Sequence, residues 1–488
     1  MSFLSPGFFL FFPVVTVVWF LLPGTARRLW LLCASWWFLL CGGPEHLISL
    51  LAATVVTYLG ARVLDRYKGG RRKAVLAVLL VLLFGTLFLL KYLSFSLGLL
   101  ERVLTASGLA FSSPALDLIL PAGLSFYLFM AAGYLIDVYR RDRPAEKSYL
   151  NLALFLSCFP YLLSGPIGRA GSLLPQFRKP APFCWENFRR GLLRFLWGAF
   201  KKLVIADRLG LMVSTVYAAP DSFGRLQVVA AAIAFSIQIY CDFSAYSDMA
   251  LGCAEVMGFH LMENFRTPYF SRSIGEFWRR WHISLSSWFR DYLYIPLGGS
   301  RKGRRRKYLN ILIVFAVSGL WHGAALSFVV WGLLNGIYQV IGGMTQKARD
   351  RIRRRLGLAD DAPFTIVLQV VITFLLSTVA WVFFKGGSFT HSLSIFRAML
   401  TGPWLIRPFS AWGLDLPELV VVAVAVLLLL AVDLFSVLRG SPRQTFFSLP
   451  RPVRWVLALA LLLAGLIFGG YGTGYGPPDF IYFQFCHG

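Results

Sequence analysis

The chain of 488 residues is 57% hydrophobic and 16% aromatic, and its mean hydropathy is +0.65. This composition excludes a single soluble globule and predicts an all-α polytopic membrane protein. The formal net charge of +25 comes from Lys and Arg residues that separate apolar segments instead of forming one basic face, which argues against a nucleic-acid partner.

The apolar segments predict helices that cross the bilayer in alternating directions, with membrane lipid as their solvent. Segments such as 74–90 and 364–384 carry no charge and match the roughly 20 residues that a bilayer core requires. The expected spans are 7–22, 29–42, 45–63, 74–98, 117–138, 364–384, 417–437 and 453–470.

Basic clusters predict which side of the membrane each loop occupies, because Lys and Arg concentrate on the cytoplasmic side. On this rule both the N-terminus and the C-terminus lie outside the cell. We treat residues 1–488 as one membrane domain with N-terminal spans (1–140), a core (141–345), C-terminal spans (346–470) and an external aromatic tail (471–488). The clusters used are Arg27 with Arg28, residues 62–73, residues 140–143, Lys201 with Lys202, residues 301–307 and residues 347–355.

His322 lies in the apolar stretch FAVSGLWHGAALSFVVW, between the last two basic clusters. Residues 308–343 are therefore expected to enter the membrane and return, with His322 near the turn, as much as roughly 20 Å inside a core about 30 Å thick. An ionisable side chain at that depth is a candidate functional residue, and the alternative is a neutral histidine bonded to a neighbouring helix. Gly319 and Gly323 would allow another backbone or a ligand to approach closely.

Residues 275–307 are too polar to span the membrane and predict a helix at its interface. Phe277, Trp281 and Trp288 fall at helical spacing on one side of this helix. His282 in the same segment is either a second functional histidine or a side chain at the headgroup level.

The seven cysteines form no CxxC pair, and most lie in apolar stretches, as Cys33, Cys158 and Cys253 do. They are expected to be small buried hydrophobic residues, with no metal site and no redox role.

Three blocks of the sequence resemble the bacterial membrane-bound O-acyltransferase (MBOAT) family. They are YCDFSAYSDMALG (240–252), ENFRTPYFSRSIGEFWRRWHISLSSWFRDYLYIPLGG (263–299) and SGLWHGA (318–324). The resemblance covers residues 1 to 345 and is greatest to the alginate O-acetylases, with the D-alanyl transferases more distant. It implies a multi-helix fold with re-entrant or interfacial helices around a central tunnel. It also implies that His322, near the constriction, and His282 are the family's two catalytic histidines.

The resemblance implies O-acyl transfer, most simply of acetyl, from a cytoplasmic thioester to an exopolysaccharide such as alginate. A neutral imidazole, whose ordinary pKa is about 6.5, suits removal of a hydroxyl proton during attack on a thioester. Acetyl-CoA or a cytoplasmic acyl carrier would be the donor, and no bound cofactor is expected. The resemblance further implies an external partner of the serine-hydrolase (SGNH) type, within the exopolysaccharide machinery of a bacterial inner membrane.

Other polar and aromatic residues near the motifs are candidates for substrate binding. Asp242 and Asp248 lie in an apolar segment, where they would orient a histidine or form ion pairs with Arg279 or Arg280. The full candidate set is Asp242, Asp248, Arg279, Arg280, Trp281 and Trp321.

The C-terminal sequence PPDFIYFQFCHG follows a glycine-rich run and resembles the aromatic motif of a small partner protein of the D-alanyl transferases. Tyr482 carries the hydroxyl inside this motif and is a candidate acyl relay, although a tyrosine of pKa about 10 needs a base nearby. The alternative is an aromatic plug in the outer mouth of the tunnel.

Two alternative functions stay open from the sequence. One is D-alanyl transfer to a cell-envelope polymer. The other is a transporter, channel or inactive scaffold with intramembrane histidines, although the paired broken helices of a repeated transporter are not evident.

Overall fold

The computed structural model describes residues 1–114, 118–163 and 165–470, so Tyr482 and the rest of the tail lie outside the described residues. Within these ranges the regular structure is helical and contains no strand. Six helices of the described chain are long and apolar enough to cross a membrane. The prediction of an all-α polytopic membrane protein is confirmed.

The chain divides into two compact units, each described here by itself. Within the described residues, unit 1 comprises residues 1–195 and 247–262, and unit 2 comprises residues 196–246 and 263–470. Both histidines of the family motifs lie in unit 2. The division of one membrane domain into N-terminal spans, core, C-terminal spans and external tail remains a prediction.

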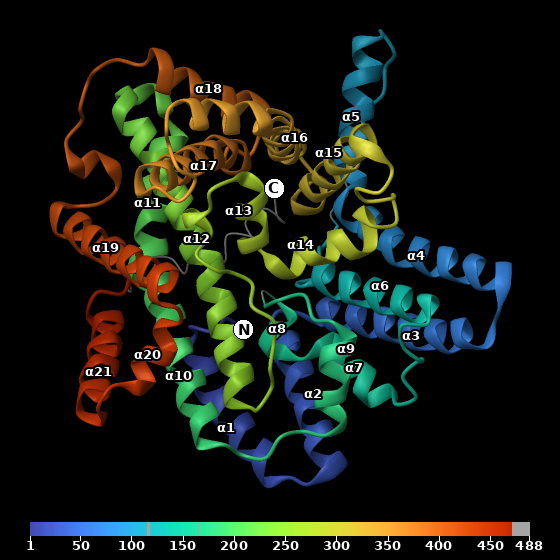
Figure 1. Ribbon diagram of the computed structural model, residues 1–488. Helices are drawn as coiled ribbons and strands as arrows, with labels where there is room; N and C mark the ends of the chain where they lie inside the picture. Colours follow the sequence, from blue (N-terminus) through green and yellow to red (C-terminus); the bar gives the residue numbers. More distant parts are fainter. Residues whose placement is uncertain (115–117, 164, 471–488) are drawn as a thin grey trace. The chain divides into compact units, whose positions relative to one another are not determined.

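Helices α1 to α10 lie within residues 1–200 (Figure 1). They are α1 (Pro6–Leu21), α2 (Gly24–Leu40), α3 (Pro44–Arg66), α4 (Gly69–Lys91), α5 (Leu93–Ala106), α6 (Leu124–Arg140), α7 (Tyr149–Ser157), α8 (Phe159–Leu162), α9 (Ala170–Arg178) and α10 (Trp185–Phe200).

The rest of the described chain alternates long helices with short helical turns. The long ones are α11 (Asp207–Ala218), α12 (Arg225–Val256), α15 (Gly303–His322), α16 (Leu326–Arg355), α17 (Pro363–Lys385), α18 (Phe389–Thr401), α19 (Leu416–Arg439) and α21 (Arg451–Ile467). The short ones are α13 (Ile274–Arg280), α14 (Ile283–Phe289), α20 (Pro442–Ser448), the π-helical stretches Lys201–Ala206 and Arg290–Tyr294, and the 3₁₀ turns Pro220–Ser222, Pro268–Phe270 and Phe409–Trp412.

Two expected spans each differ from the structure by seven residues at one end. The span expected over 74–98 ends at Lys91, where α4 gives way to the separate helix α5 after Tyr92. The span expected over 117–138 begins only at Leu124, as α6. Among the cysteines, Cys158 and Cys253 are buried as expected, whereas Cys33 is exposed on α2.

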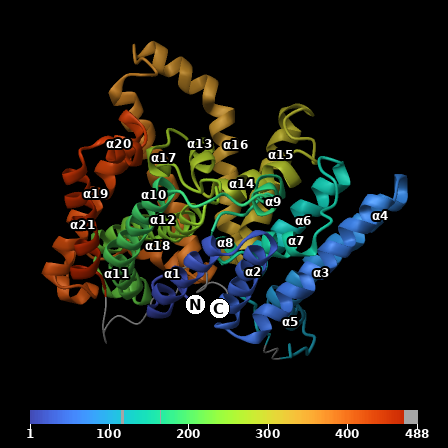
Figure 2. The same cartoon turned by 90° about the horizontal axis from the view of Figure 1, so that it is seen from below.

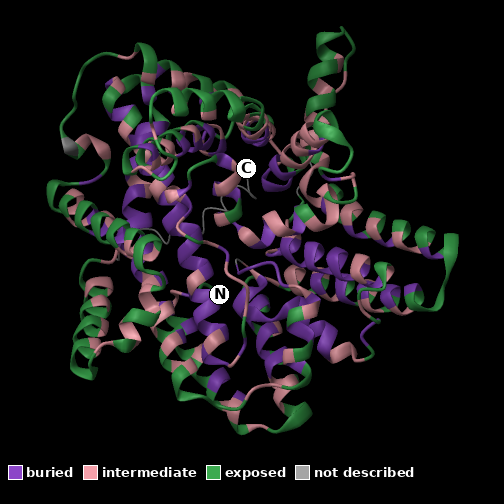
Figure 3. Cartoon of the chain, viewed as in Figure 1, coloured by how far each residue is buried: buried purple, intermediate pink, exposed green. Residues whose placement is uncertain are grey.

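Burial separates helices that form protein cores from those that offer apolar side chains to the surroundings (Figure 3). In the most apolar window of α12, 78% of residues are buried, against 17% in α4 and in α19. An apolar helix that stays exposed in a folded chain is suited to contact lipid, because hydrocarbon replaces the protein partner that it would need in water.

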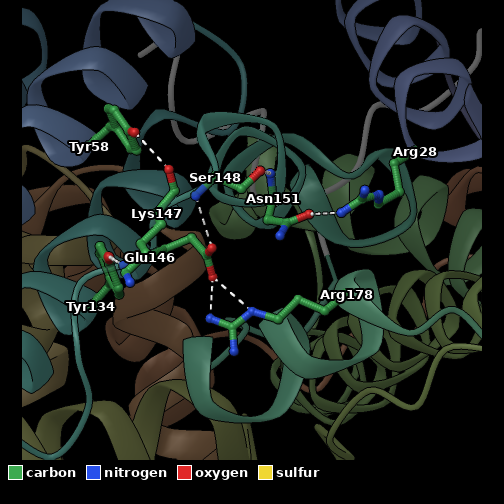
Figure 4. Close-up of polar contacts among 8 residues, drawn as sticks. All are labelled: Arg28, Tyr58, Tyr134, Glu146, Lys147, Ser148, Asn151 and Arg178. Atoms are coloured by element: carbon green, nitrogen blue, oxygen red, sulfur yellow. Dashed lines mark hydrogen bonds and ion pairs between the residues drawn. The ribbon is translucent and has the colours of Figure 1, made fainter. Parts of the chain in front are cut away.

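A polar cluster inside unit 1 fixes the loop between α6 and α7 (Figure 4). The buried Glu146 carboxylate accepts hydrogen bonds from Arg178 Nε at 3.0 Å and from the Ser148 backbone N–H at 3.0 Å. The Glu146 backbone N–H donates to the Tyr134 hydroxyl at 2.7 Å. A buried carboxylate persists only with such partners, so the cluster ties the start of α7 to α9.

Candidate functional site

His322 is the last residue of α15, and α16 begins four residues beyond it, at Leu326. The two helices form a hairpin and lie side by side in both views (Figures 1 and 2). The prediction that His322 sits at the turn of a returning segment is confirmed. The 20 residues of α15 rise about 30 Å, so His322 lies far from the basic sequence that opens α15 and closes α16.

Glycines allow the backbones of this hairpin to pack closely. A Cβ atom added at Gly319 would collide with the Phe328 carbonyl oxygen, and one added at Gly332 would collide with the Phe315 carbonyl oxygen. A Cβ at Gly323 would collide with the ring of Phe328. The close neighbour expected at Gly319 and Gly323 is therefore α16, as in small-residue interfaces of membrane helices.

Aromatic rings from three helices surround the His322 imidazole, which is 4% exposed. Its ring centroid lies 4.9 Å from that of Trp331 on α16, at an interplanar angle of 88°. The centroid of Phe384 on α17 lies 5.4 Å away, and that of the adjacent Trp321 lies 4.8 Å away. Edge-to-face packing of this kind holds a ring in one orientation.

Trp331 supplies a buried hydrogen-bond donor next to His322. Its side chain is 1% exposed, and among the described residues its indole Nε1–H has no hydrogen-bond acceptor. Leaving such a donor unsatisfied costs about 1–3 kcal/mol, so an orphaned group calls for an explanation. Sequence reasoning missed Trp331, because an isolated tryptophan in an apolar helix does not differ from a packing residue.

The segment around His282 differs from the single interfacial helix that was expected. It consists of α13 and α14, broken at Trp281 and His282, and the backbone of His282 adopts the left-handed region at φ +44°. Trp281, Phe277 and Trp288 are buried. His282 is 0% exposed, so its side chain faces the protein interior and not the surroundings of the chain.

Hydrogen bonds and a ring contact hold His282 in place. Its Nδ1 lies 3.2 Å from Asn264 Oδ1, and the Phe243 ring lies 4.6 Å away at 90°. Burial lowers the pKa of His282 to about 3. The imidazole is therefore neutral at physiological pH. Sequence reasoning also missed Asn264, which lies inside a quoted family block but has no chemical pattern of its own.

Trp321 contacts both histidines, with ring centroids 6.1 Å from His282 and 4.8 Å from His322. Trp281 reaches the same cluster through Trp381, which lies 5.0 Å from Trp281 and 5.5 Å from Trp331. The structure thus gathers both histidines and both candidate tryptophans into one aromatic cluster.

The candidate carboxylates and arginines do not form the ion pairs that were suggested for them. Asp242 pairs with Lys202 at 2.7 Å, and Asp248 pairs with Arg194 at 2.9 Å. Arg280 pairs instead with Glu276 at 2.6 Å. The remaining candidate, Arg279, is exposed.

Lys201 and Lys202 were expected to mark a cytoplasmic loop, and this expectation is wrong. Both are buried in the π-helical stretch Lys201–Ala206. Lys202 Nζ lies 2.8 Å from Asp207, in addition to its contact with Asp242, and Lys201 Nζ donates to Ser244 Oγ at 2.6 Å. Two acidic residues stabilise the Lys202 charge and a hydroxyl accepts from Lys201 inside unit 2, and neighbouring residues alone could not reveal these partners.

Comparisons with known proteins agree with the motifs around this site. The family model described as MBOAT, the membrane-bound O-acyltransferase family, matches residues 47–386, which include His282 and His322. A probable alginate O-acetylase AlgI from Pseudomonas putida is 34% identical over 498 residues, covering 98% of each chain. A peptidoglycan O-acetyltransferase from Helicobacter pylori is 32% identical over 428 residues, covering 80% of this chain and 78% of that protein. A teichoic acid D-alanyltransferase from Bacillus subtilis is 24% identical over 294 residues, covering 57% of this chain and 72% of that protein.

Proposed function

Since the chain belongs to the membrane-bound O-acyltransferase family, and is therefore an O-acyltransferase, we propose that it uses a cytoplasmic thioester to acetylate an exopolysaccharide such as alginate. The observation that carries this proposal is the position of His322 at the turn of the α15–α16 hairpin, in a chain that aligns along its whole length with a probable alginate O-acetylase. The membrane of action is the bacterial inner membrane, with both termini outside.

His322 acts as the general base in the proposed reaction. Its imidazole takes the proton of an acceptor hydroxyl while the hydroxyl oxygen attacks the thioester carbonyl carbon, so a C–O bond forms and the carbonyl oxygen becomes an oxyanion. Collapse of this intermediate breaks the C–S bond. The departing thiolate recovers the proton from the imidazolium, which returns His322 to its starting state.

Trp331 is the donor that we assign to the oxyanion. Its indole N–H is buried, lacks an acceptor among the described residues and belongs to a ring in contact with His322. A donor that is fixed before the reaction stabilises developing charge without reorganisation, and one such group is worth about 10² to 10³ in rate.

The basic sequence at the far end of the hairpin is suited to attract the donor. Residues 301–307 span the start of α15, and residues 347–355 form the C-terminal end of α16. Because the two helices pack antiparallel, both basic runs lie at the end of the hairpin away from His322. Acetyl-CoA and acyl carrier proteins are both anionic, and a positive surface raises their local concentration.

Delivery on the outside requires a second acceptor, which we assign to an external serine-hydrolase-like partner of the exopolysaccharide machinery. Tyr482 is the proposed relay: its hydroxyl would accept the acetyl group from the thioester and pass it on as a tyrosyl ester. Tyr482 lies outside the described residues, and its role rests on the sequence motif.

Transfer of D-alanine is the second candidate function. The similarity to a teichoic acid D-alanyltransferase supports it, but the identity and coverage are lower than for the acetylases. An alternative transport function would leave no covalent product.

The test supplies membranes containing the protein and purified alginate with either radiolabelled acetyl-CoA or a radiolabelled D-alanyl carrier. The expected result is ester-linked acetyl on the polymer, lost in the His322→Gln protein. Transfer of D-alanine alone would replace the acetyl proposal, and solute movement without ester formation would support the transporter.

A further inference from the structure

The geometry around His282 points to Asn264 as a positioning residue that holds His282 in the tautomer protonated on Nδ1, which leaves the lone pair on Nε2. The inference rests on the proposed function, in which we take His282 as the second catalytic histidine beside the base His322. It assigns a role to a residue that neither the motifs nor the ion pairs single out.

The orientation of the Asn264 amide follows from a neighbour that can only donate. The backbone N–H of Ser284 points to one terminal atom of Asn264 at 3.3 Å, and the Ser284 hydroxyl donates to the same atom at 2.8 Å. A backbone N–H requires an acceptor, so this atom is the carbonyl oxygen Oδ1 and not the amide nitrogen.

The tautomer of His282 follows from that orientation. His282 Nδ1 lies 3.2 Å from the same Asn264 Oδ1. Because the carbonyl oxygen only accepts hydrogen bonds, Nδ1 must carry the proton; two lone pairs would otherwise face each other in a buried site. A neutral imidazole protonated on Nδ1 has its basic lone pair on Nε2.

Two further contacts hold this arrangement. The Ile283 backbone N–H donates to the Asn264 backbone carbonyl at 3.0 Å, which ties the loop of Asn264 to the start of α14. His282 is the N-cap residue of α14, but its side chain makes no capping hydrogen bond. Asn264 Oδ1 instead accepts the hydrogen bond from the Ser284 backbone N–H at the start of α14. The left-handed backbone of His282 at φ +44° is thereby fixed.

This dual contact allows a purely structural role for Asn264, as the remote cap of α14. The two roles are separated by the protonation state of the His282 ring, which a cap alone would not set. A carboxylate accepts from both Ser284 and His282 Nδ1–H, so it should preserve the cap and the tautomer, whereas Asn264→Leu should lose both. Ser284→Ala is the matched control, because it removes one donor to the same oxygen and leaves the contact with His282 intact.

The decisive experiment is nitrogen NMR of the full-length protein with labelled histidine in lipid nanodiscs, in which protonated and unprotonated imidazole nitrogens give separate signals. The difference spectrum against His282→Gln assigns the signals of His282 among the six histidines of the chain. We expect a protonated Nδ1 and an unprotonated Nε2 in the wild type, Ser284→Ala and Asn264→Asp. In Asn264→Leu we expect that preference to be lost and kcat to fall by about 10² or more, because an imidazole in the wrong tautomer loses its contribution to proton transfer.

A wild-type His282 protonated on Nε2 would overturn the inference, whatever the variants do. If the tautomer is as stated but His282→Gln retains full activity, the positioning by Asn264 stands and the part of His282 in the proposed function fails. An unfolded Asn264→Leu protein leaves the wild-type spectrum and the Asn264→Asp variant to decide the tautomer.

Discussion

Substitution of His322 by glutamine separates its chemical role from its packing role. Glutamine retains a polar side chain but has no imidazole, so the general base is lost. Such a base contributes about 10² to 10⁴ in rate, which corresponds to about 3–5 kcal/mol of transition-state stabilisation. We expect acyl transfer per folded molecule to fall by that factor.

The packing cost can be worked out from the three ring contacts of His322, which join it to Trp321, Trp331 and Phe384. Aromatic pairs contribute about 0.5–1.5 kcal/mol each, so the substitution should reduce stability by about 2–4 kcal/mol. This loss lowers the melting temperature without itself explaining a rate loss per folded molecule.

The assay measures ester-linked acetyl on purified polymer and normalises it to folded protein, quantified by fluorescence-detected size exclusion in detergent. His391→Gln is the matched control, since His391 lies on α18 and its hydrogen bonds are with Ser388 and Ser394. Acylation near the wild-type level per folded molecule in the His322→Gln protein would refute the assignment of the base and leave His322 as a packing residue.

The remaining predictions concern the oxyanion, the tail, the donor surface and pH. Trp331→Phe retains the ring and removes the N–H, so kcat should fall by about 10² to 10³ with little change in donor KM; an unchanged kcat in steady-state assays would contradict the role. Tyr482→Phe should abolish transfer if the tail is a relay, whereas a nearly silent substitution, or no acyl adduct in intact-mass spectra during turnover, would favour the aromatic plug. Neutralising several arginines in 301–307 and 347–355 should raise donor KM, an effect that should shrink with added salt; unchanged donor kinetics would leave these residues with topology alone. Burial lowers the pKa of His282 from 6.5 to about 3, so between these pH values only the unfolded chain gains a proton at this residue. The free energy of unfolding should therefore decrease as the pH falls from 6.5 to 3, by about 5 kcal/mol at most. His282→Gln should flatten that part of the stability profile in thermal denaturation, and parallel profiles would contradict the assignment.

The sequence predicts the membrane-spanning architecture well because a bilayer imposes a one-dimensional rule. An apolar run must be long enough to cross, and α3, α17 and α19 lie within three residues of their expected bounds. The hairpin at His322 was predictable for the same reason, since basic runs on both sides require the chain to return.

Details of the site depend on contacts between distant parts of the chain, which periodicity does not encode. The helical spacing of Phe277, Trp281 and Trp288 suggested one interfacial helix, but a left-handed residue at His282 breaks it, and contacts from the remote Asn264 help to hold that break. Trp331 was missed likewise, because its importance comes from the ring that it touches.

The buried charges of unit 2 show how a polar residue in an apolar helix can be mistaken for a substrate ligand. Asp242 shares Lys202 with Asp207, at 2.7 and 2.8 Å, and all three side chains are buried. Changing one member of such a group disturbs the pairing of the others, and a buried charge that loses its partner costs about 3–5 kcal/mol, which is a large part of the stability of most proteins. Loss of activity after substitution of Asp242 therefore does not identify a catalytic group. The triple change of Asp242→Asn and Asp207→Asn with Lys202→Met leaves no member of the group charged, and activity restored in that variant would assign the cluster to the fold, leaving the chemistry to the histidines and the tryptophan beside them.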